Sequence, residues 1–253
     1  MEGEAAHHLG RVLRAERGQL YELSDGEHVW LARVEGVKRE CIGFSLIEEL
    51  PVYRPQFQAT LLLSIVKFDA FEFALEKATE LGVGMIVPLA AARSEKALVA
   101  AAPKRAERWK KILLEASQQS RRLRIPALAP VAKPGSVFSS CSERLKILLS
   151  ERSGAASLRN ILEGYSRAGG ASVASPGDAN RAIADPEGQT AAEGGASATL
   201  GIGPEGGWTD GEFECARRYG FCEASLGRLI LRTETAVVAG LASLNYAFSG
   251  QEE

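Results

Sequence analysis

The stretch of this chain best suited to chemistry is rich in glycine. Residues 200–207 read LGIGPEGG, and Gly201, Gly203 and Gly206 match the spacing G-x-G-x-x-G. In dinucleotide-binding proteins such glycines let the backbone approach a pyrophosphate, and an acidic residue further along the chain binds a ribose. Glu223 stands near the position of that acid. A nicotinamide-binding oxidoreductase is therefore one interpretation of the pattern.

Three features of the region count against a dinucleotide site. Pro204 removes a backbone N–H from the loop that would have to donate to the pyrophosphate. Thr209 and Glu212 form a T-x-x-E capping box, which starts the following helix beyond the third glycine. The dinucleotide fold usually opens with this unit, whereas here two predicted helices and one predicted strand are all that follow. No G-K-[ST] sequence is present, so a P-loop is excluded.

A second turn of related composition lies close behind the first. Residues 225–236 read SLGRLILRTETA. Each turn follows a predicted strand, and ligands of open α/β sheets bind at the carboxyl ends of the strands. Glycines in both turns allow the backbone to approach a flat ligand closely. The two turns together predict a ligand site that is not a dinucleotide fingerprint.

The elements that must position these turns fall into two groups, and the first group is built from short strands. Residues 1–66 contain four apolar stretches with a Ser-Asp-Gly turn between the first two, which predicts a small β-barrel or compact β-domain. The four predicted strands are residues 19–25, 28–37, 41–50 and 57–66.

Residues 67–250 alternate between helical periodicity and short buried strands. In the first helix Phe71, Ala74, Leu75 and Ala78 share one face, and Gly82 ends it. The alternation predicts an α/β domain with a mostly parallel sheet that is covered on both faces. The predicted helices are 69–82, 102–122, 210–220 and 233–249, and the predicted strands are 84–90, 144–150, 198–203 and 221–225.

One segment of the second group lacks any apolar period. Ala, Gly and Ser make up most of residues 166–198. Such a composition cannot bury enough apolar surface to form a core, so we expect a flexible surface insertion that carries no chemistry.

Charge and composition narrow the classes of function. The net charge is −2, yet residues 104–124 carry eight Lys and Arg against two Glu. This local excess predicts either a solvated helix face or a surface that attracts polyanions. The four cysteines lack C-x-x-C spacing, and no apolar run reaches membrane-spanning length. Residues 1–14 contain no apolar region, so we expect no secretory leader. We expect a cytoplasmic protein with reduced thiols, no metal site and no membrane segment.

The sequence also resembles a known family. IGPEGGWTDGE at 202–212 and LGRLILRTETA at 226–236 resemble the paired signatures of the RsmE family, the 16S ribosomal RNA uridine N3-methyltransferases of the SPOUT class. Three further stretches are similar to family motifs and occur in the same order: HHLGRVLR at 7–14, KATELGVGMIVPL at 77–89 and RWKKILLEASQQSRR at 108–122. Gln118, where the family often has Glu, and the segment 166–198 depart from the family pattern.

The resemblance implies a fold and an activity. It implies an N-terminal PUA-like β-barrel for RNA binding (residues 1–66) and a C-terminal SPOUT α/β domain with a trefoil knot (residues 67–250). The implied reaction transfers a methyl group from S-adenosyl-L-methionine to N3 of a uridine in 16S rRNA of the small ribosomal subunit. The implied assembly is a homodimer.

The resemblance also implies site residues. Glu205 and Arg232 are the candidate catalytic residues, and the alternative for Glu205 is a solvent-facing loop residue. Thr233 could simply cap the last helix, and Thr235 could serve helix packing as readily as ligand contact. The implied cofactor-binding residues are Leu200, Gly201, Ile202, Gly203, Gly206, Leu226, Gly227, Leu229, Ile230, Leu231 and Thr235. The implied RNA-binding residues are Arg14, Lys104, Arg105, Arg108, Arg121, Arg122 and Arg124.

Two alternatives to the methyltransferase remain. One is the nicotinamide-binding oxidoreductase, which cofactor binding would distinguish. The other is a non-catalytic RNA-binding protein of ribosome assembly, which turnover would distinguish. The presence of both turns argues against the second alternative, because an unused pocket has no physical need for two glycine-rich loops.

Overall fold

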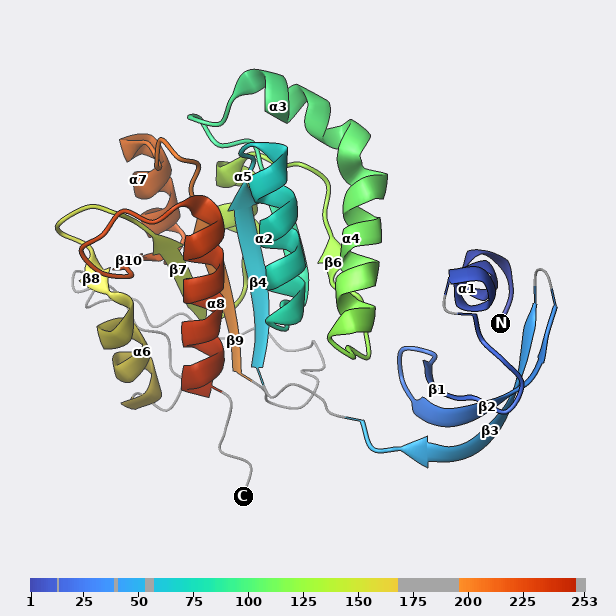
Figure 1. The fold of residues 1–253 in the computed structure, drawn as a ribbon. Coiled ribbons are helices and arrows are strands. Elements are labelled where there is room, and N and C mark those ends of the chain that lie inside the picture. The colour runs from blue at the N-terminus through green and yellow to red at the C-terminus, as the bar shows by residue number, and fades with distance from the viewer. Residues whose placement is uncertain (13, 39–40, 53–56, 168–195, 249–253) are drawn as a thin grey trace. The chain divides into compact units, whose positions relative to one another are not determined.

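The computed structural model describes the chain except for residues 13, 39–40, 53–56, 168–195 and 249–253 (Figure 1). The described residues form two compact units. The first comprises residues 1–54 together with the short segment 121–124, and the second comprises residues 55–120 and 125–253.

The first unit is built on a three-stranded antiparallel sheet in the order β1-β2-β3. Asp25 shapes the turn between the first two strands: its Oδ1 accepts hydrogen bonds from the N–H groups of Glu27 and His28, both at 2.8 Å. These two backbone hydrogen bonds lower the pKa of the Asp25 carboxyl, and the one from His28 has the larger effect. The predicted Asp-Gly turn is thus confirmed. The elements of this unit are α1 (Gly3–His7), the π-helical turn η1 (His8–Val12), β1 (Leu20–Ser24), β2 (Val29–Val37) and β3 (Ile42–Leu50).

A small apolar core holds this sheet. Ala6, Ala15, Val34 and Ile42 are buried together, and Tyr21 and Phe44 pack against them. The two rings meet edge to face, with centroids 6.3 Å apart. An antiparallel sheet with one covered face is the arrangement expected of a small β-domain.

The second unit contains a seven-stranded sheet in which each described strand pair is parallel, in the order β6-β5-β4-β9-β7-β10-β8. The predicted parallel sheet is therefore confirmed. The strands are β4 (Phe57–Ser64), β5 (Met85–Leu89), β6 (Ala127–Leu128), β7 (Leu145–Leu149), β8 (Ala156–Ser157), β9 (Ala196–Ile202) and β10 (Cys222–Ser225).

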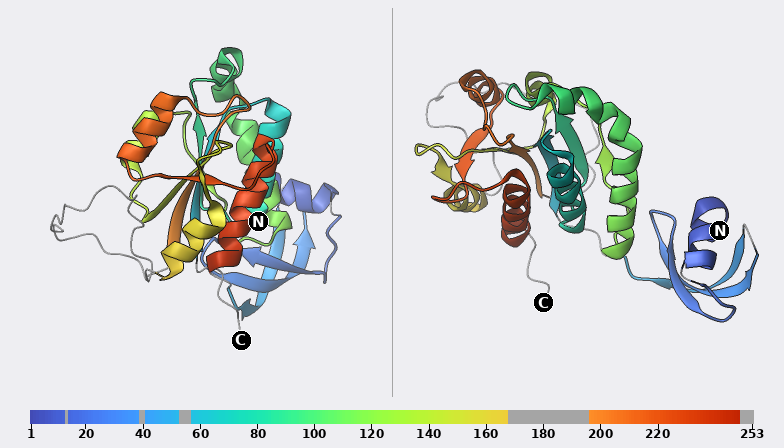
Figure 2. Two further views of the ribbon diagram at one scale, coloured as in Figure 1. Left: turned by 90° about the vertical axis from the view of Figure 1, so that its left-hand side faces the viewer. Right: turned by 45° about the horizontal axis from the view of Figure 1, so that its top comes forward.

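Side-chain alternation on the strands supplies two cores, one on each face of the sheet. On β4, Leu61 and Leu63 belong to the larger core, whereas Leu62 belongs to the smaller one. The larger core packs against α2 (Phe68–Glu80), α4 (Ala106–Gln119), α6 (Leu158–Arg167) and α8 (Thr233–Phe248). The smaller core packs against α5 (Pro134–Ser140) and α7 (Asp210–Arg218). Figure 2 shows α8 lying between α6 and α2 on the same face.

The helix predicted at 69–82 is α2, and its four predicted apolar residues are buried. Gly82 follows the helix with a φ of +85° and donates its N–H to Thr79 O at 3.0 Å. The predicted helix 102–122 is two elements, the 3₁₀ turn η2 (Ala102–Arg105) and α4. The remaining helix, α3 (Lys96–Ala101), precedes η2.

The predicted domain boundary at residue 66 assigns one strand, residues 57–64, to the wrong unit. Residues 57–64 form β4, which lies between β5 and β9 in the parallel sheet of the second unit. The continuous apolar run LLLSIV is typical of a strand buried on both faces, as parallel strands are. The first unit therefore ends before β4 begins.

The expected insertion at 166–198 is shorter than predicted at both ends. Residues 166 and 167 complete α6, and residues 196–198 begin β9. Residues 168–195 lie outside the described part of the chain.

Gly240 lies where α8 approaches the sheet closely. A Cβ built at this position would lie 2.8 Å from Leu200 Cδ2 on β9. Glycine therefore lets the helix approach the sheet more closely than a larger residue would. Of the described helices, none is long and apolar enough to span a membrane.

Candidate functional site

The two glycine-rich turns meet at one edge of the sheet. β7, β9 and β10 are parallel neighbours, so their carboxyl ends lie side by side, where ligands of α/β sheets bind. Residues 203–208, here the first glycine loop, follow β9, and residues 226–232, the second glycine loop, follow β10. Together they border one cleft, lined by Leu149, Ser150, Glu151, Ile202, Gly203, Pro204, Glu205, Gly207, Trp208, Ser225, Leu226, Gly227, Leu229, Ile230, Leu231, Thr233 and Ala236.

The first glycine loop is a tight turn fixed from inside. Gly207 donates its N–H to Pro204 O at 2.8 Å and has a φ of +68°, a conformation that favours glycine. Gly203 lies against the Trp208 ring, and a Cβ there would be 3.1 Å from Trp208 Nε1. That indole nitrogen donates to Leu149 O at 3.1 Å. The loop is therefore anchored to the end of the neighbouring strand β7.

The helix after this loop begins as predicted. Thr209 caps α7 by accepting from the N–H of Glu212, and the Glu212 carboxylate accepts from the N–H of Thr209 at 2.8 Å. The capping box satisfies N–H groups that the helix start leaves without partners. It also fixes the direction in which the chain leaves the cleft.

The second glycine loop brings apolar side chains to the cleft. Gly227 has a φ of +138°, and its N–H donates to Ser225 Oγ at 3.1 Å. Leu229 and Ile230 line the cleft, and each is 82% exposed. Apolar side chains so little covered by protein offer a surface that a flat ligand can bury.

Thr233 connects the two loops. It is the first residue of α8, it is buried, and its hydroxyl donates to Gly203 O at 3.3 Å. Thr233 therefore does more than start the last helix, because its hydrogen bond joins α8 to the first glycine loop.

The structure brings most of the predicted catalytic and cofactor-binding residues together. Glu205 lines the cleft, as do the predicted cofactor-binding residues Ile202, Gly203, Leu226, Gly227, Leu229, Ile230 and Leu231.

The remaining predicted residues lie elsewhere in this part of the fold. Leu200 is fully buried in the larger core. Gly201 packs against Leu148, because a Cβ built at Gly201 would lie 2.6 Å from Leu148 Cδ1. Gly206 rests against the Arg93 side chain. Arg232 and Thr235 are exposed and are not among the described residues that line the cleft.

One wall of the cleft consists of residues for which the sequence predicted no part in the site. Leu149, Ser150 and Glu151 come from the end of β7. The stretch was recognised as a buried strand, but its place beside β9 and β10 follows from the sheet order, which apolar patterning does not encode. Glu151 adds a second carboxylate beside Glu205, and a Cβ at Gly207 would lie 2.5 Å from its Oε1.

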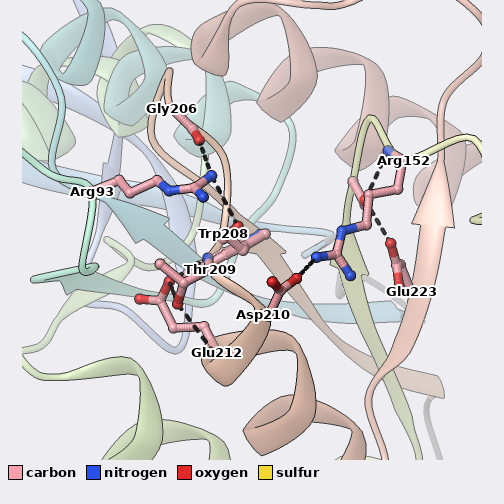
Figure 3. Close-up of polar contacts among 9 residues, drawn as sticks. Arg93, Arg152, Gly206, Trp208, Thr209, Asp210, Glu212 and Glu223 are labelled. Carbon is pink, nitrogen blue, oxygen red and sulfur yellow. Dashed lines mark hydrogen bonds and ion pairs between the residues drawn. The ribbon is translucent and has the colours of Figure 1, made fainter.

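Glu223 is placed differently from the ribose-binding acid of a dinucleotide site. Its carboxylate accepts from Ser150 Oγ at 2.7 Å, and it is not among the described residues that line the cleft. Figure 3 shows Glu223 beside Arg152, which pairs with Asp210. The Arg152 guanidinium also stacks on the Phe213 ring, its Cζ 4.0 Å from the ring centroid. These contacts tie β7 and β10 to α7 and serve structure.

Much of the predicted basic surface is occupied by ion pairs within the chain. Glu72, an almost fully buried carboxylate on α2, accepts from Arg108 Nε at 2.8 Å and from Arg105 Nη1 at 3.4 Å. Arg105 also stacks on Phe68, 4.7 Å from the ring centroid. These two arginines therefore stabilise the packing of α2 against η2 and α4, and an RNA phosphate would compete with Glu72 for them.

The other predicted RNA-binding residues vary in exposure. Lys104, Arg14, Arg121 and Arg124 are exposed. Arg121 lies 3.8 Å from Glu22, and Arg124 lies 3.5 Å from Glu27. Burial lowers the pKa of Arg122. Within the described residues, Lys104 and Arg14 are exposed and make no ion pair, so a phosphate could reach their charges without displacing a carboxylate.

The four cysteines are not in disulfides and are half-buried. Burial raises the pKa of the Cys141 and Cys222 thiols, which keeps them in the neutral form. No group of three or more His, Cys, Asp or Glu side chains among the described residues could hold a metal ion.

The parallel sheet and the cleft at the carboxyl ends of its strands define an α/β protein whose candidate ligand site lies beside two glycine-rich loops. A family model described as an RNA methyltransferase domain matches residues 53–245. The chain therefore belongs to the RNA methyltransferase family. Its relatives are named ribosomal RNA small subunit methyltransferase E, and the chain belongs to that branch of the family.

Two relatives of that name show the extent of the similarity. The protein of Aquifex aeolicus is 31% identical over 242 residues, which cover 94% of this chain and 89% of the relative. The protein of Synechocystis is 30% identical over 246 residues, covering 94% of this chain and 70% of the relative.

Two solved structures share the fold. The ribosomal RNA small subunit methyltransferase E of Neisseria gonorrhoeae, bound to S-adenosyl methionine, is 26% identical with a TM-score of 0.78, covering 98% of this chain and 91% of that one. A methyltransferase of Legionella pneumophila in complex with SAM is 28% identical with a TM-score of 0.74, covering 96% and 89% of the two chains.

Proposed function

We propose that the protein transfers a methyl group from S-adenosyl-L-methionine to N3 of a uridine in 16S rRNA of the small ribosomal subunit. The observation that carries this proposal is the meeting of the two glycine loops in one cleft at the carboxyl ends of β7, β9 and β10. The family membership and the cofactor bound by the two similar structures support it. The nicotinamide alternative is not favoured, since Glu223 does not line the cleft.

The residues of the cleft fit the cofactor. Leu229 and Ile230 expose apolar surface on which an adenine ring can lie. Apart from its chain neighbours, no described residue lies within 4 Å of a Cβ built on Gly227, so the backbone there is open to a ligand. When bound, the cofactor supplies a methyl group on a sulfonium, which is an electrophile that needs no metal ion.

The residues of the chain then have to position the uracil and remove the imide proton from N3. Glu205 and Glu151 are the two carboxylates of the cleft, from the first glycine loop and the end of β7. We assign proton removal to one of these carboxylates and to the other a hydrogen bond with the cofactor. Arg232 is exposed at the end of the second glycine loop, where a guanidinium can hold an RNA phosphate or a uracil oxygen.

We assign RNA binding to the first unit and to the exposed basic residues. Arg14 is exposed next to η1, and its φ of 51° places it at a sharp turn of the chain. Lys104 adds charge from the second unit. Contacts of this kind hold a phosphate backbone without reading its sequence. A PUA-like barrel for the first unit is compatible with its antiparallel sheet.

Three further features belong to this proposal. A trefoil knot is proposed from the resemblance of residues 202–212 and 226–236 to the paired signatures of the family. A homodimer through α8 is supported by Tyr246, which is 91% exposed on that helix. A cytoplasmic location follows from a ribosomal RNA substrate.

The test is methyl transfer from labelled S-adenosyl-L-methionine to small ribosomal subunits from cells that lack this activity. Assembled subunits and protein-free 16S rRNA are assayed side by side, and NAD is titrated against the protein in parallel. Transfer to either RNA substrate, with no binding of NAD, supports the proposal. Binding of NAD without transfer would overturn it in favour of an oxidoreductase.

A further inference from the structure

Arg93 is outside the cleft, yet it holds the loop that forms one wall of it. It follows β5, and its Nη1 donates to Gly206 O at 2.6 Å and lies 3.3 Å from Trp208 O (Figure 3). Both carbonyls belong to the first glycine loop. Hydrogen bonds from a charged guanidinium are stronger than those between neutral groups, so this contact restrains two points of the loop with one side chain.

The segment that carries Arg93 is tied to the same region by a second contact. The N–H of Ala92 donates to Glu212 Oε1 at 2.8 Å. Glu212 Oε2 accepts in turn from the N–H of Thr209, within the capping box of α7. The backbone before Arg93 is therefore fixed to the helix that follows the loop, which places the guanidinium opposite the loop carbonyls.

The loop also rests on the aliphatic part of the arginine. A Cβ built at Gly206 would lie 3.4 Å from both Cβ and Cδ of Arg93. The backbone at Gly206 is thus in direct contact with the side chain that bonds its carbonyl. Since Gly203, Glu205 and Gly207 line the cleft from this loop, a displacement of Arg93 changes the shape of the cleft.

We propose that Arg93 is a positioning residue that holds the first glycine loop in the conformation that binds S-adenosyl-L-methionine. This inference rests on the proposed function, because it concerns the affinity of the cleft for that cofactor. Arg93 is not among the described residues that line the cleft, so it acts through Gly206 and Trp208 and has no role at the reacting atoms.

The test compares Arg93→Ala and Arg93→Lys with the wild-type chain. Calorimetric titration gives the Kd for S-adenosyl-L-methionine, and steady-state transfer to RNA gives kcat and KM. We expect Arg93→Ala to raise Kd and KM about tenfold, as expected for losing a hydrogen bond to a charged group. At saturating cofactor kcat stays close to the wild-type value, because the reacting groups are untouched. Lysine keeps the charge and restores part of the affinity.

The matched control is Arg159→Ala. Arg159 is also an exposed arginine, but it pairs with the Glu163 carboxylate within α6, away from the glycine loops, so its loss leaves Kd unchanged. An unchanged Kd for folded Arg93→Ala would overturn the inference, and so would a loss of RNA affinity with an unchanged Kd for the cofactor. If the alanine variant does not fold, Arg93→Gln carries the same comparison. Failure of the wild-type chain to bind the cofactor would instead refute the proposed function.

Discussion

The hydroxyl of Thr233 donates a hydrogen bond to the carbonyl oxygen of Gly203 at 3.3 Å. This contact joins the first turn of α8 to the first glycine loop, so the two walls of the cleft are connected directly. Arg93 restrains the same loop at its other end, through Gly206 and Trp208. The cleft is thus shaped by side chains whose own function is structural.

Removing the Thr233 hydroxyl tests this connection. Thr233→Val keeps the shape of the side chain but leaves Gly203 O without its donor. We expect a loss of stability of about 0.5–1.5 kcal/mol, the usual net value of one hydrogen bond, and a weaker affinity for S-adenosyl-L-methionine. Urea unfolding and calorimetric titration measure the two effects. Thr233→Ser retains the hydroxyl and should keep the wild-type affinity; equal weakening in both variants would argue against the hydrogen bond.

Gly207 is predicted to be intolerant of any side chain. Its φ is +68°, and a Cβ would lie 2.5 Å from Glu151 Oε1, at the wall of the cleft. We expect Gly207→Ala to weaken cofactor binding about tenfold or more, because both the loop and Glu151 must move, and tenfold corresponds to about 1.4 kcal/mol.

Gly18 supplies the control for backbone strain. Its φ is +92°, and no atom lies within 4 Å of a Cβ built there. Gly18→Ala should therefore cost stability without changing the affinity for the cofactor. Equal affinities of the two alanine variants, by titration, would show that Gly207 does not shape the site.

Two helical glycines should respond to alanine in opposite directions. At Gly240 in α8 a Cβ would lie 2.8 Å from the buried Leu200. Overpacking in Gly240→Ala should therefore lower the free energy of unfolding by about 1–3 kcal/mol, which exceeds the gain in helix propensity. At Gly164 in α6 nothing lies within 4 Å, and alanine should stabilise by about 0.5–1 kcal/mol. Urea unfolding of the two variants measures the difference. A stabilised Gly240→Ala would refute the close contact of α8 with β9.

The basic surface is predicted to contain residues with different functions. Lys104→Ala should weaken RNA binding and reduce its dependence on salt, with no loss of stability, because the side chain is exposed. Arg108→Ala should mainly destabilise the fold, since it leaves the buried Glu72 without its shorter ion pair, at 2.8 Å. Filter binding at several salt concentrations and thermal unfolding separate the two effects. Equal loss of RNA affinity in both variants, with stability unchanged, would contradict this division.

Local patterns predicted local structure well. The face of α2 formed by Phe71, Ala74, Leu75 and Ala78 is buried as expected, and the capping box of Thr209 and Glu212 is formed. These features depend on residues within a few positions of one another, so spacing alone reveals them.

The order of the strands could not be predicted in the same way. The apolar run of β4 marks a strand but does not identify its neighbours, so it was assigned to the wrong unit. The wall of the cleft made by Ser150 and Glu151 was missed for the same reason. Arg93 follows an unremarkable alanine-rich stretch, and its importance depends on contacts with residues more than a hundred positions away.

The most direct test of the central claim is the identity of the methylated nucleoside. Small ribosomal subunits from cells lacking the activity are incubated with the protein and labelled S-adenosyl-L-methionine, and their 16S rRNA is digested to nucleosides. The account predicts that the label is recovered as N3-methyluridine, and that it is reduced by Gly207→Ala but not by Gly18→Ala. Label in a different nucleoside, or no transfer by a protein that binds the cofactor, would contradict it.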